Sequence, residues 1–493
     1  MRALERAITE RVPVEGLASV SPLHGLRRRR IGPMDVAAQS FAAVAPAGVA
    51  LMNPGTVSRE AGPFALASVI TTVLVVMLLA FVLSQFTRRI ASAGSLYTFV
   101  VRGLGPRAGV VAGACLGVGY GSIAVVCLVD AAARVQRMSG GAVEVAVLVV
   151  VATAVLIAAV NALGVRISTR VLLIVEALAV ITVSAIAVTV LIGSQGALAD
   201  VRPVVGLDMH AVLAGVAVGL IAFVGFESGI ALGPETRRPL ASVTRALGWT
   251  VLAVSLSYLL AATAQLAGQA PFHESGEISE IAATGLGLHG LTAFVEVIII
   301  LSFLACALAT TTALVRLLFV MSREGLVGDV FGRTGARGTP ATGGALVAAA
   351  VGAVALAGAA VPAASDAVRH TADAAAILGY VSVYLLVAAA APVFLMRIGE
   401  FRWASALPAF VVVLVLAMTL VHYVTAVPAD RLVHVLFAIG VIALLAVLLM
   451  LRAQHRSAVL QRLGLYDLPV ASDTIGGTPA VAVNQLPRAD AEP

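Results

Sequence analysis

The chain has 493 residues, of which 60% are hydrophobic and only 12% are charged, with a formal net charge of +6. Soluble domains carry roughly a quarter charged residues, so this composition leaves too little polar surface to cover a globule in water. It excludes an ordinary soluble domain. The basic net charge does not indicate a nucleic-acid partner, because the arginines cluster at the ends of apolar segments rather than along one soluble face.

Apolar runs of about twenty residues, each long enough to cross ~30 Å of hydrocarbon, predict about twelve transmembrane helices. In chain order we expect spans at 34–57, 64–86, 107–133, 143–163, 171–192, 211–232, 243–267 and 291–320, and four more that begin near 341, 374, 405 and 432. The predicted fold class is an all-α membrane protein. Residues 1–30 form an N-terminal tail in this interpretation, 31–455 a membrane domain, and 456–493 a polar tail without ordered structure.

The arginines also predict the orientation. Loops assigned to the inside hold about three times as many arginines as those assigned to the outside, as the positive-inside rule expects. Both termini are then cytoplasmic, in a multi-pass protein of the inner membrane. The acidic loop that holds Glu274, Glu277 and Glu280 lies outside.

The three cysteines, Cys115, Cys127 and Cys306, all fall inside apolar spans, which excludes a disulfide framework and a CxxC metal site. The histidines show no metal-ligand spacing. We expect neither a cofactor nor a bound metal.

The first span is interrupted near its middle by Pro46 and Gly48. A break in a membrane helix frees backbone groups that lipid cannot satisfy, so it persists only where protein or a water-filled cavity supplies partners. A simple proline kink is the alternative interpretation.

The sixth span carries Glu227 between Gly225 and Gly229. If the chain contains two repeats of five spans, the first and sixth spans correspond, and matched interruptions in two halves mark the substrate site of a transporter. Close helix packing is the alternative role for Gly225.

The chemistry of such a site follows from helix ends. A broken helix exposes N–H groups at the start of one half and C=O groups at the end of the other. The N–H groups suit the carboxylate of an α-amino acid, and the carbonyls suit its ammonium group.

These segments resemble the amino acid–polyamine–organocation superfamily of permeases. The similar stretches are FVGFESGIALGPETRRPLASVTRA at the sixth span, RIASAGSLYTFVVRGLGPRAGVVAG between the second and third spans, and VRLLFVMSREGLVG at the end of the eighth. The resemblance covers roughly residues 31–338. It implies a five-plus-five inverted-repeat core with two accessory helices, 31–455 as the permease domain, and alternating access.

Carried onto this chain, the resemblance implies a substrate site made by backbone groups of the two broken spans. The residues that match the carboxylate cradle and the amine-facing positions are Pro46, Ala47, Gly48, Ile221, Val224 and Gly225. Pro46 departs from the family's Gly-Ser/Thr-Gly pattern and cannot donate an N–H. Some proton-coupled relatives place a lysine in the fifth span, where this chain has Glu176, so the coupling ion, H⁺ or Na⁺, stays open.

A carboxylate within the membrane costs about 2.5–3.5 kcal/mol on insertion scales, so each one is expected to have a functional or structural role. We expect Glu176 to act in coupling, as a proton carrier, and Glu227 in gating, together with Phe223 and Phe226. Tyr120, Ser302, Cys306, Tyr380 and Tyr384 are candidates for lining the cavity. The alternative for each residue is packing, and for Glu176 a neutral or paired side chain. Asp130 and Arg134, spaced i, i+4, are expected to form a local pair.

The leading hypothesis is therefore a secondary transporter for amino acids or related amines, coupled to protons or sodium or working as an exchanger. The alternative is a transport-inactive membrane sensor that binds an amine. An enzyme is not expected, because the spans contain no Ser/His, paired-Asp or His/Glu constellation. The expected partners are the small substrate, possible coupling ions and the lipid bilayer, without nucleic acid.

Overall fold

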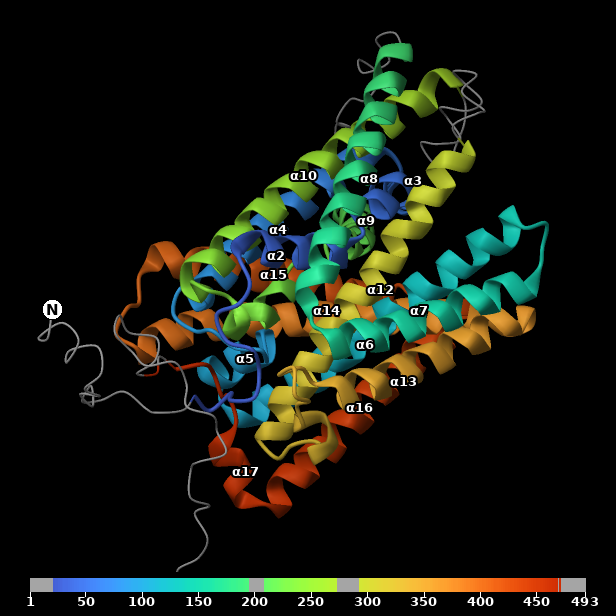
Figure 1. Cartoon of the computed structure of the whole chain (residues 1–493). Helices are drawn as coiled ribbons and strands as arrows, with labels where there is room; N and C mark the ends of the chain where they lie inside the picture. Colours follow the sequence, from blue (N-terminus) through green and yellow to red (C-terminus); the bar gives the residue numbers. More distant parts are fainter. Residues whose placement is uncertain (1–20, 195–207, 273–291, 469, 471–493) are drawn as a thin grey trace, which may run out of the picture.

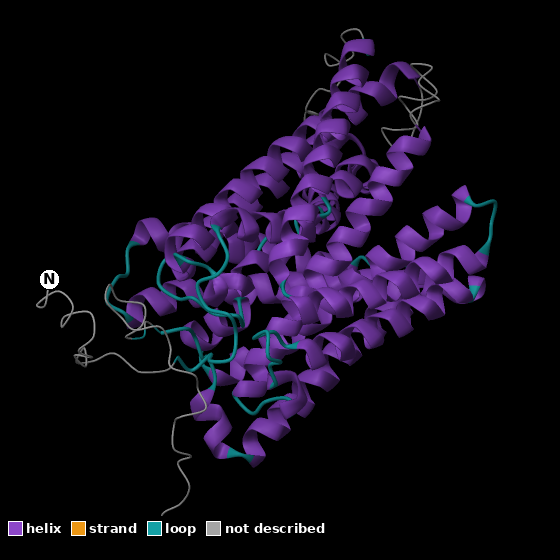
Figure 2. Ribbon diagram, in the orientation of Figure 1, coloured by secondary structure: helices purple, strands orange, loops and turns teal. Residues whose placement is uncertain are grey.

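The computed structural model describes residues 21–194, 208–272, 292–468 and 470, and these are almost entirely helical (Figure 2). The elements are α2 (Pro33–Val44), α3 (Pro46–Ala61), η1 (Gly62–Phe64), α4 (Ala65–Thr87), α5 (Leu96–Leu104), α6 (Pro106–Met138), α7 (Val143–Leu163), α8 (Val165–Gly193), α9 (Met209–Ile221), η3 (Ser228–Glu235), α10 (Pro239–Phe272), α12 (Thr292–Arg323), η5 (Asp329–Gly332), α13 (Ala341–Ala360), α14 (Pro362–Arg397), α15 (Trp403–Thr425), α16 (Ala429–His455) and α17 (Ser457–Arg462).

Ten helical stretches within the described residues are long and apolar enough to cross a membrane, which confirms the all-α membrane fold class. The predicted total of twelve stays a prediction. It requires the 55-residue stretch Pro33–Thr87 to cross twice and the interrupted α9–η3 segment to cross once. The α7 bounds match the predicted span, whereas α14 begins at Pro362 rather than near 374. Its first turns carry Asp366 and Arg369, so hydropathy does not reveal them although they continue the helix.

The outer helices present large apolar side chains outward. Leu148, Ile181, Phe410 and Val433 are each 65% exposed in the isolated chain. A membrane supplies the apolar surroundings that these side chains lack here, while every helix satisfies its own backbone hydrogen bonds internally. The pattern is that of helices whose outer faces contact lipid.

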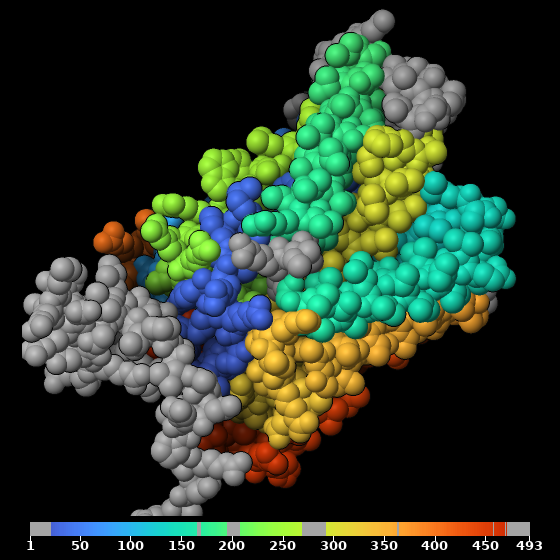
Figure 3. Space-filling model, in the orientation of Figure 1, coloured from blue at the N-terminus to red at the C-terminus, as the bar shows by residue number. Residues whose placement is uncertain are grey.

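The helices pack as two sets that cross at an angle. In Figure 1, α6, α7, α13 and α16 run side by side, and α8, α10 and α12 form a second set inclined to them. The extensive contacts pair α3 with α9, α4 with α10, α6 with α12, and α7 with α13. These are the spans that a two-repeat interpretation matches, but α6 packs as extensively against α14, which lies outside that matching. The two-repeat organisation stays a prediction. Figure 3 shows the blue N-terminal segment against α8 on one face, in agreement with contacts between α2 and α8.

Small residues permit close contact between the central helices. A Cβ on Gly379 of α14 would lie 2.6 Å from the Cys115 carbonyl oxygen of α6. Membrane helices use such residues because their association depends on close packing rather than on the exclusion of water. The α6–α14 contact holds Tyr120 of α6 close to Tyr380 and Tyr384 of α14.

The two described terminal segments lie together at one end of the bundle, which we name the terminal face. Asp467 accepts a hydrogen bond from Ser21 and pairs with Arg28 and Arg29, at 2.7, 3.0 and 2.9 Å. The expectation that the tail from residue 456 onward lacks order therefore does not fit residues 457–468. Residues 469 and 471–493 of that tail, residues 1–20, and the acidic loop with Glu274, Glu277 and Glu280 lie outside the described residues.

Candidate functional site

The first span is interrupted at Ala45, where α2 ends and α3 begins. Ala45 has φ 50° and ψ 57°, and Pro46 follows it at the first position of α3. A residue before proline is disfavoured in the right-handed helical region, so the helix cannot continue through Ala45. The left-handed conformation of a non-glycine residue costs about 1–2 kcal/mol. The helix therefore ends at Val44 and a new one begins at Pro46, which excludes the simple kink.

This break leaves backbone donors without helical acceptors. The first N–H of α3 that finds a helical acceptor is that of Val49, which donates to the Ala45 carbonyl at 3.0 Å. Pro46 has no N–H, which leaves the N–H groups of Ala47 and Gly48 at the start of the helix with its partial positive charge. Ala47 is completely buried, so these donors lie away from solvent.

The sixth span is interrupted by residues 222–227, between α9 and η3. Successive tight turns occupy this stretch, and Gly225 has φ 96°, which L side chains rarely adopt. The Ile221 carbonyl accepts a turn hydrogen bond from Val224 N–H at 3.2 Å. A carbonyl has two lone pairs, so this bond does not exhaust its accepting capacity.

The two breaks touch each other. A Cβ on Gly225 would lie 2.5 Å from the carbonyl oxygen of Ala43, which is in the last turn of α2. The Cys306 thiol of α12 donates to the same carbonyl at 3.0 Å. The carbonyl end of one half-helix, the glycine turn of the other broken span and α12 therefore meet at one point.

Polar contacts fix α2 against η3 and α12. Ser228 Oγ donates to the Gln39 carbonyl at 3.2 Å, and Gly229 N–H donates to Ser40 Oγ at 3.1 Å. The Gln39 side-chain amide donates to the Ala309 carbonyl at 2.7 Å. The sequence interpretation missed Gln39 and Ser40. Two adjacent polar residues in an otherwise apolar span were the available signal.

Glu227 is the centre of a buried polar cluster. Its carboxyl accepts hydrogen bonds from the hydroxyls of Tyr120 on α6, at 3.1 Å, and Tyr384 on α14, at 2.6 Å. The backbone N–H groups of Gly225 and Glu227 also face the carboxyl. This arrangement links the α9–η3 break to α6 and α14. The gating role of Glu227 stays a prediction.

Tyr380 lies beside this cluster but is bonded differently. Its ring packs edge-on against Tyr120, with centroids 5.6 Å apart, and it is completely buried. Within the described residues, its hydroxyl has no hydrogen-bond partner. A buried hydroxyl without a partner costs roughly 1–3 kcal/mol, so this group requires an explanation.

The two predicted gate phenylalanines face different helices. Phe223 packs edge-on against Tyr258 of α10, with centroids 5.5 Å apart, and Tyr258 donates to the Asn53 side chain of α3 at 2.5 Å. Phe226 packs against Tyr384, with centroids 5.8 Å apart. Both phenylalanines are fully buried. Their gating role stays a prediction.

Glu176 of α8 is fully buried, and its partner is a hydroxyl. Ser302 Oγ of α12 lies 3.0 Å from each carboxyl oxygen. The adjacent Phe303 contacts the α3 start, because a Cβ on Gly48 would lie 2.6 Å from its ring. Ser302, the partner of Glu176, is therefore the chain neighbour of the residue that contacts the start of α3.

Other charged groups join different helices. Arg316 of α12 pairs with Glu235 at the end of η3 at 2.8 Å, and both side chains are less than 10% exposed. This buried pair was missed, although both residues occur in the resembling stretches. Asp130 pairs with Arg369 of α14 and Arg134 with Glu296 of α12, at 2.7 and 2.8 Å. Both residues of the expected local pair therefore bridge to other helices, and the Asp130–Arg134 pair stays a prediction.

The terminal face contains a carboxyl outside the spans. Glu324, which directly follows α12, accepts hydrogen bonds from the Tyr97 hydroxyl and from Gly464 and Leu465 N–H, the last two at 2.7 Å. Burial raises the pKa of Glu324 to about 7, against the smaller lowering effects of these donors and of Arg102. The group therefore joins α5, α12 and the C-terminal segment in a pH-sensitive contact.

The structure thus brings most of the predicted site residues to one region. Around the two breaks lie Pro46, Ala47, Gly48, Val224, Gly225, Phe226, Glu227, Tyr120, Cys306 and Tyr380. The Ile221 carbonyl is engaged in the turn, and the Glu176–Ser302 pair lies to one side. Within the described ranges, no three His, Cys, Asp or Glu side chains gather to form a metal site.

Two interrupted spans in contact within a helical membrane bundle are typical of secondary transporters. The chain belongs to the amino acid permease family, whose sequence model matches residues 35–456. This confirms the resemblance read from the sequence. No curated protein sequence matches the chain. The family makes it a multi-pass amino acid transporter in general terms.

Proposed function

We propose that this protein is a secondary active transporter that moves an amino acid or a related amine by alternating access. The contact between the two broken spans carries the proposal, because it brings the carbonyl end of α2 against the glycine turn that follows α9, beside the start of α3. A zwitterionic amino acid needs N–H groups for its carboxylate and carbonyls for its ammonium group, and both must lie within the short distance that separates the two charges. No side-chain charge is needed to hold it.

In this proposal the substrate carboxylate binds the N–H groups of Ala47 and Gly48. The ammonium group binds carbonyls of the α9–η3 break, with Val224 and the remaining lone pair of Ile221 as the candidates. The Tyr380 hydroxyl supplies a further hydrogen bond, which accounts for its lack of a partner among the described residues. Pro46 contributes by stopping the helix rather than by donating.

Coupling to protons is the favoured mode, with Glu176 as the carrier. Its carboxyl is buried and bonded to a neutral hydroxyl rather than to a cation, so it can take up or release a proton when the site opens to water. Glu227 is held by two tyrosines and acts in gating. Exchange without a coupling ion is the alternative mode.

The terminal face is cytoplasmic in this proposal, and the protein lies in the inner membrane. The arginine distribution supports this orientation. Helix movement at the two breaks then opens the site alternately to the outside and to the cytoplasm.

The deciding experiment is uptake into proteoliposomes of a labelled panel of amino acids and polyamines, with pH and sodium gradients imposed separately. Saturable uptake driven by an inward proton gradient supports the proposal. Uptake that ignores both gradients but accelerates with internal substrate indicates exchange. Tight binding without uptake or counterflow of any panel member contradicts transport and supports a sensor.

A further inference from the structure

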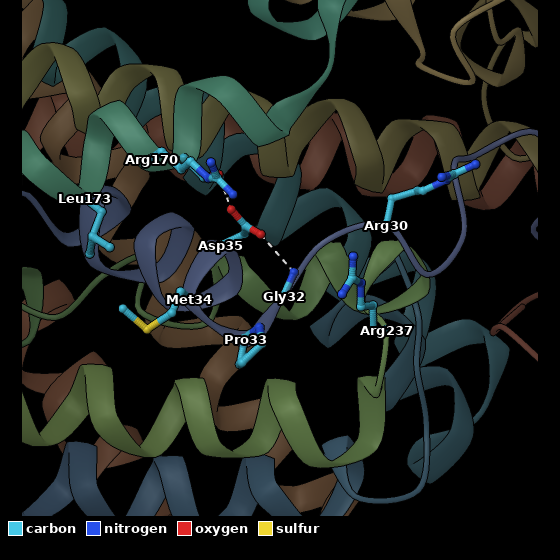
Figure 4. A pocket seen from close by; sticks show the side chains of 9 residues that line it. Arg30, Gly32, Pro33, Met34, Asp35, Arg170, Leu173 and Arg237 are labelled. Atoms are coloured by element: carbon cyan, nitrogen blue, oxygen red, sulfur yellow. Dashed lines mark hydrogen bonds between the residues drawn. The ribbon is translucent and has the colours of Figure 1, made fainter.

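A cavity with both charged and apolar lining residues lies apart from the breaks, on the terminal face. It has a volume of about 250 Å³ and is lined by residues from the start of α2, the start of α8 and the end of η3 (Figure 4): Arg30, Gly32, Pro33, Met34, Asp35, Thr169, Arg170, Leu173 and Arg237. Small-molecule sites commonly measure about 300–1,000 Å³, so this volume suits a headgroup better than a whole drug-sized ligand.

Backbone hydrogen bonds fix two of its arginines side by side. Arg30 N–H donates to the Glu235 carbonyl at 2.7 Å, and Arg237 N–H donates to the Ile31 carbonyl at 3.0 Å. Ile31 and Thr236 form a parallel bridge between these two segments. Glu235 also forms a buried ion pair with Arg316, which holds the backbone that carries Arg30 and Arg237 in place.

The cavity carries excess positive charge. It contains three arginines and one carboxylate, that of Asp35, which accepts from Gly32 N–H at 2.8 Å and from Thr169 Oγ1 at 3.0 Å. Figure 4 shows Arg170 directed toward Asp35. Within the described residues, no acidic side chain pairs with Arg30 or Arg237, whereas the neighbouring Arg28 and Arg29 pair with Asp467. The start of α2 adds partial positive charge.

The border of the cavity is apolar and faces outward. Met34 in the lining is 63% exposed, and Val171 and Ile174, which follow Arg170 on α8, are 56% and 62% exposed. Leu240, close after Arg237, is 41% exposed. Basic groups beside lipid-facing apolar side chains are typical of the level where a membrane's headgroups meet its hydrocarbon.

We infer that this cavity binds the phosphate of an anionic phospholipid headgroup in the leaflet on the terminal face. The guanidinium groups of Arg237 and Arg30, whose backbones lie side by side, bind the phosphate oxygens, with Arg30 turning in from the extended direction that Figure 4 shows. The acyl chains lie along Met34, Val171 and Ile174. Because the occupied site ties the start of α2 to α8 and η3, bound lipid stabilises the arrangement of the first broken span.

The test measures thermal unfolding of the full-length protein in detergent, titrated with dioleoyl phosphatidylglycerol, dioleoyl phosphatidylcholine or inorganic phosphate. Phosphatidylglycerol is expected to raise Tm saturably, with little effect of the other two. The double variant R30Q/R237Q is expected to weaken the apparent affinity for phosphatidylglycerol about thirtyfold, since each basic residue near an anionic membrane contributes a factor of about five.

The matched control is Arg238→Gln, an exposed neighbour outside the cavity lining, which should leave the titration unchanged. An equal loss in Arg238→Gln would mean that the effect is diffuse surface charge, and it overturns the site. An equal effect of phosphatidylcholine also overturns it. Saturation by inorganic phosphate alone overturns the lipid assignment and indicates a free-anion site. If the folded R30Q/R237Q variant gives an unaltered titration, neither arginine binds the phosphate, and the proposed site is overturned.

Discussion

The backbone of Gly225 lies against the carbonyl oxygen of Ala43, so closely that a Cβ at position 225 would come within 2.5 Å of that oxygen. Residues 182 positions apart in the chain thus form the contact between the two broken spans. A backbone carbonyl cannot rotate away as a side chain can. The contact therefore requires glycine, both for its space and for its φ of 96°.

Gly225→Ala should consequently reduce stability by about 2–4 kcal/mol, the combined cost of the strained φ and the clash, and should reduce uptake at least about tenfold. Thermal unfolding and proteoliposome uptake measure the two effects. Gly248→Ala on α10 is the control, because a Cβ there meets nothing within 4 Å. A Gly225→Ala protein with normal Tm and uptake would show that the breaks do not need this contact.

Two tyrosines one helical turn apart on α14 should behave differently. Tyr384→Phe removes a donor from the buried Glu227 and is expected to lower stability by about 1–3 kcal/mol. Tyr380→Phe removes a hydroxyl that has no partner among the described residues, so Tm should not fall. If that hydroxyl binds substrate, Kd for the best substrate of the panel rises about fivefold to tenfold. Unchanged Kd in Tyr380→Phe removes it from the site.

The start of α3 tests the carboxylate cradle. Any Cβ at Gly48 approaches the Phe303 ring at 2.6 Å, so Gly48→Val must displace that ring or the α3 start. We expect substrate affinity to fall at least about tenfold, because an oriented hydrogen bond to a charged group contributes about 1.5–3 kcal/mol. Equilibrium binding of labelled substrate measures it. The partner change Phe303→Leu should recover part of the loss, and normal affinity in Gly48→Val alone would contradict the cradle.

Glu176 provides the test of proton coupling. Glu176→Gln keeps the size of the side chain and a hydrogen bond with Ser302 but cannot carry a proton. Accumulation driven by a pH gradient should disappear, while counterflow with substrate on both sides continues at a similar rate. Ser302→Ala, which leaves the carboxyl in place, should retain some pH-driven accumulation. If Glu176→Gln still accumulates substrate against a gradient, another group carries the proton.

Glu324 should make the stability of the terminal face depend on pH. Because its pKa is about 7 in the folded protein and 4.5 is the ordinary value, the folded state binds the proton more tightly. Stability from this group is therefore complete below about pH 4.5 and declines as pH rises to about 7. The total change is about 3 kcal/mol, since each pKa unit corresponds to 1.36 kcal/mol.

Thermal unfolding between pH 5 and pH 8 measures this effect. Tm should fall with rising pH, and Glu324→Gln should flatten that part of the curve. Glu400→Gln is the control, because Glu400 lies on the same face in an exposed pair with Arg89. An identical pH profile in wild type and Glu324→Gln would exclude Glu324 as the cause.

The sequence alone determined the class of the protein and the places where its helices break. Apolar runs of membrane length admit only helices or closed barrels, and twenty-residue runs select helices. Pro46 disfavours a continuous helix, and Gly225 permits the turn that follows α9, so the sequence indicated both places as candidate interruptions, with a kink and close packing as the alternatives.

The tertiary structure decided which groups meet. Nothing local to Glu227 indicates that Tyr120 and Tyr384 donate to it, because those residues come from spans 107 and 157 positions away. The same holds for Arg316 with Glu235, and for the order of residues 457–468, whose polar composition predicts disorder in isolation. Periodicity and helix-breaking residues act within a few positions of the chain. Partner choice depends on how the helices pack, and only the folded bundle fixes that.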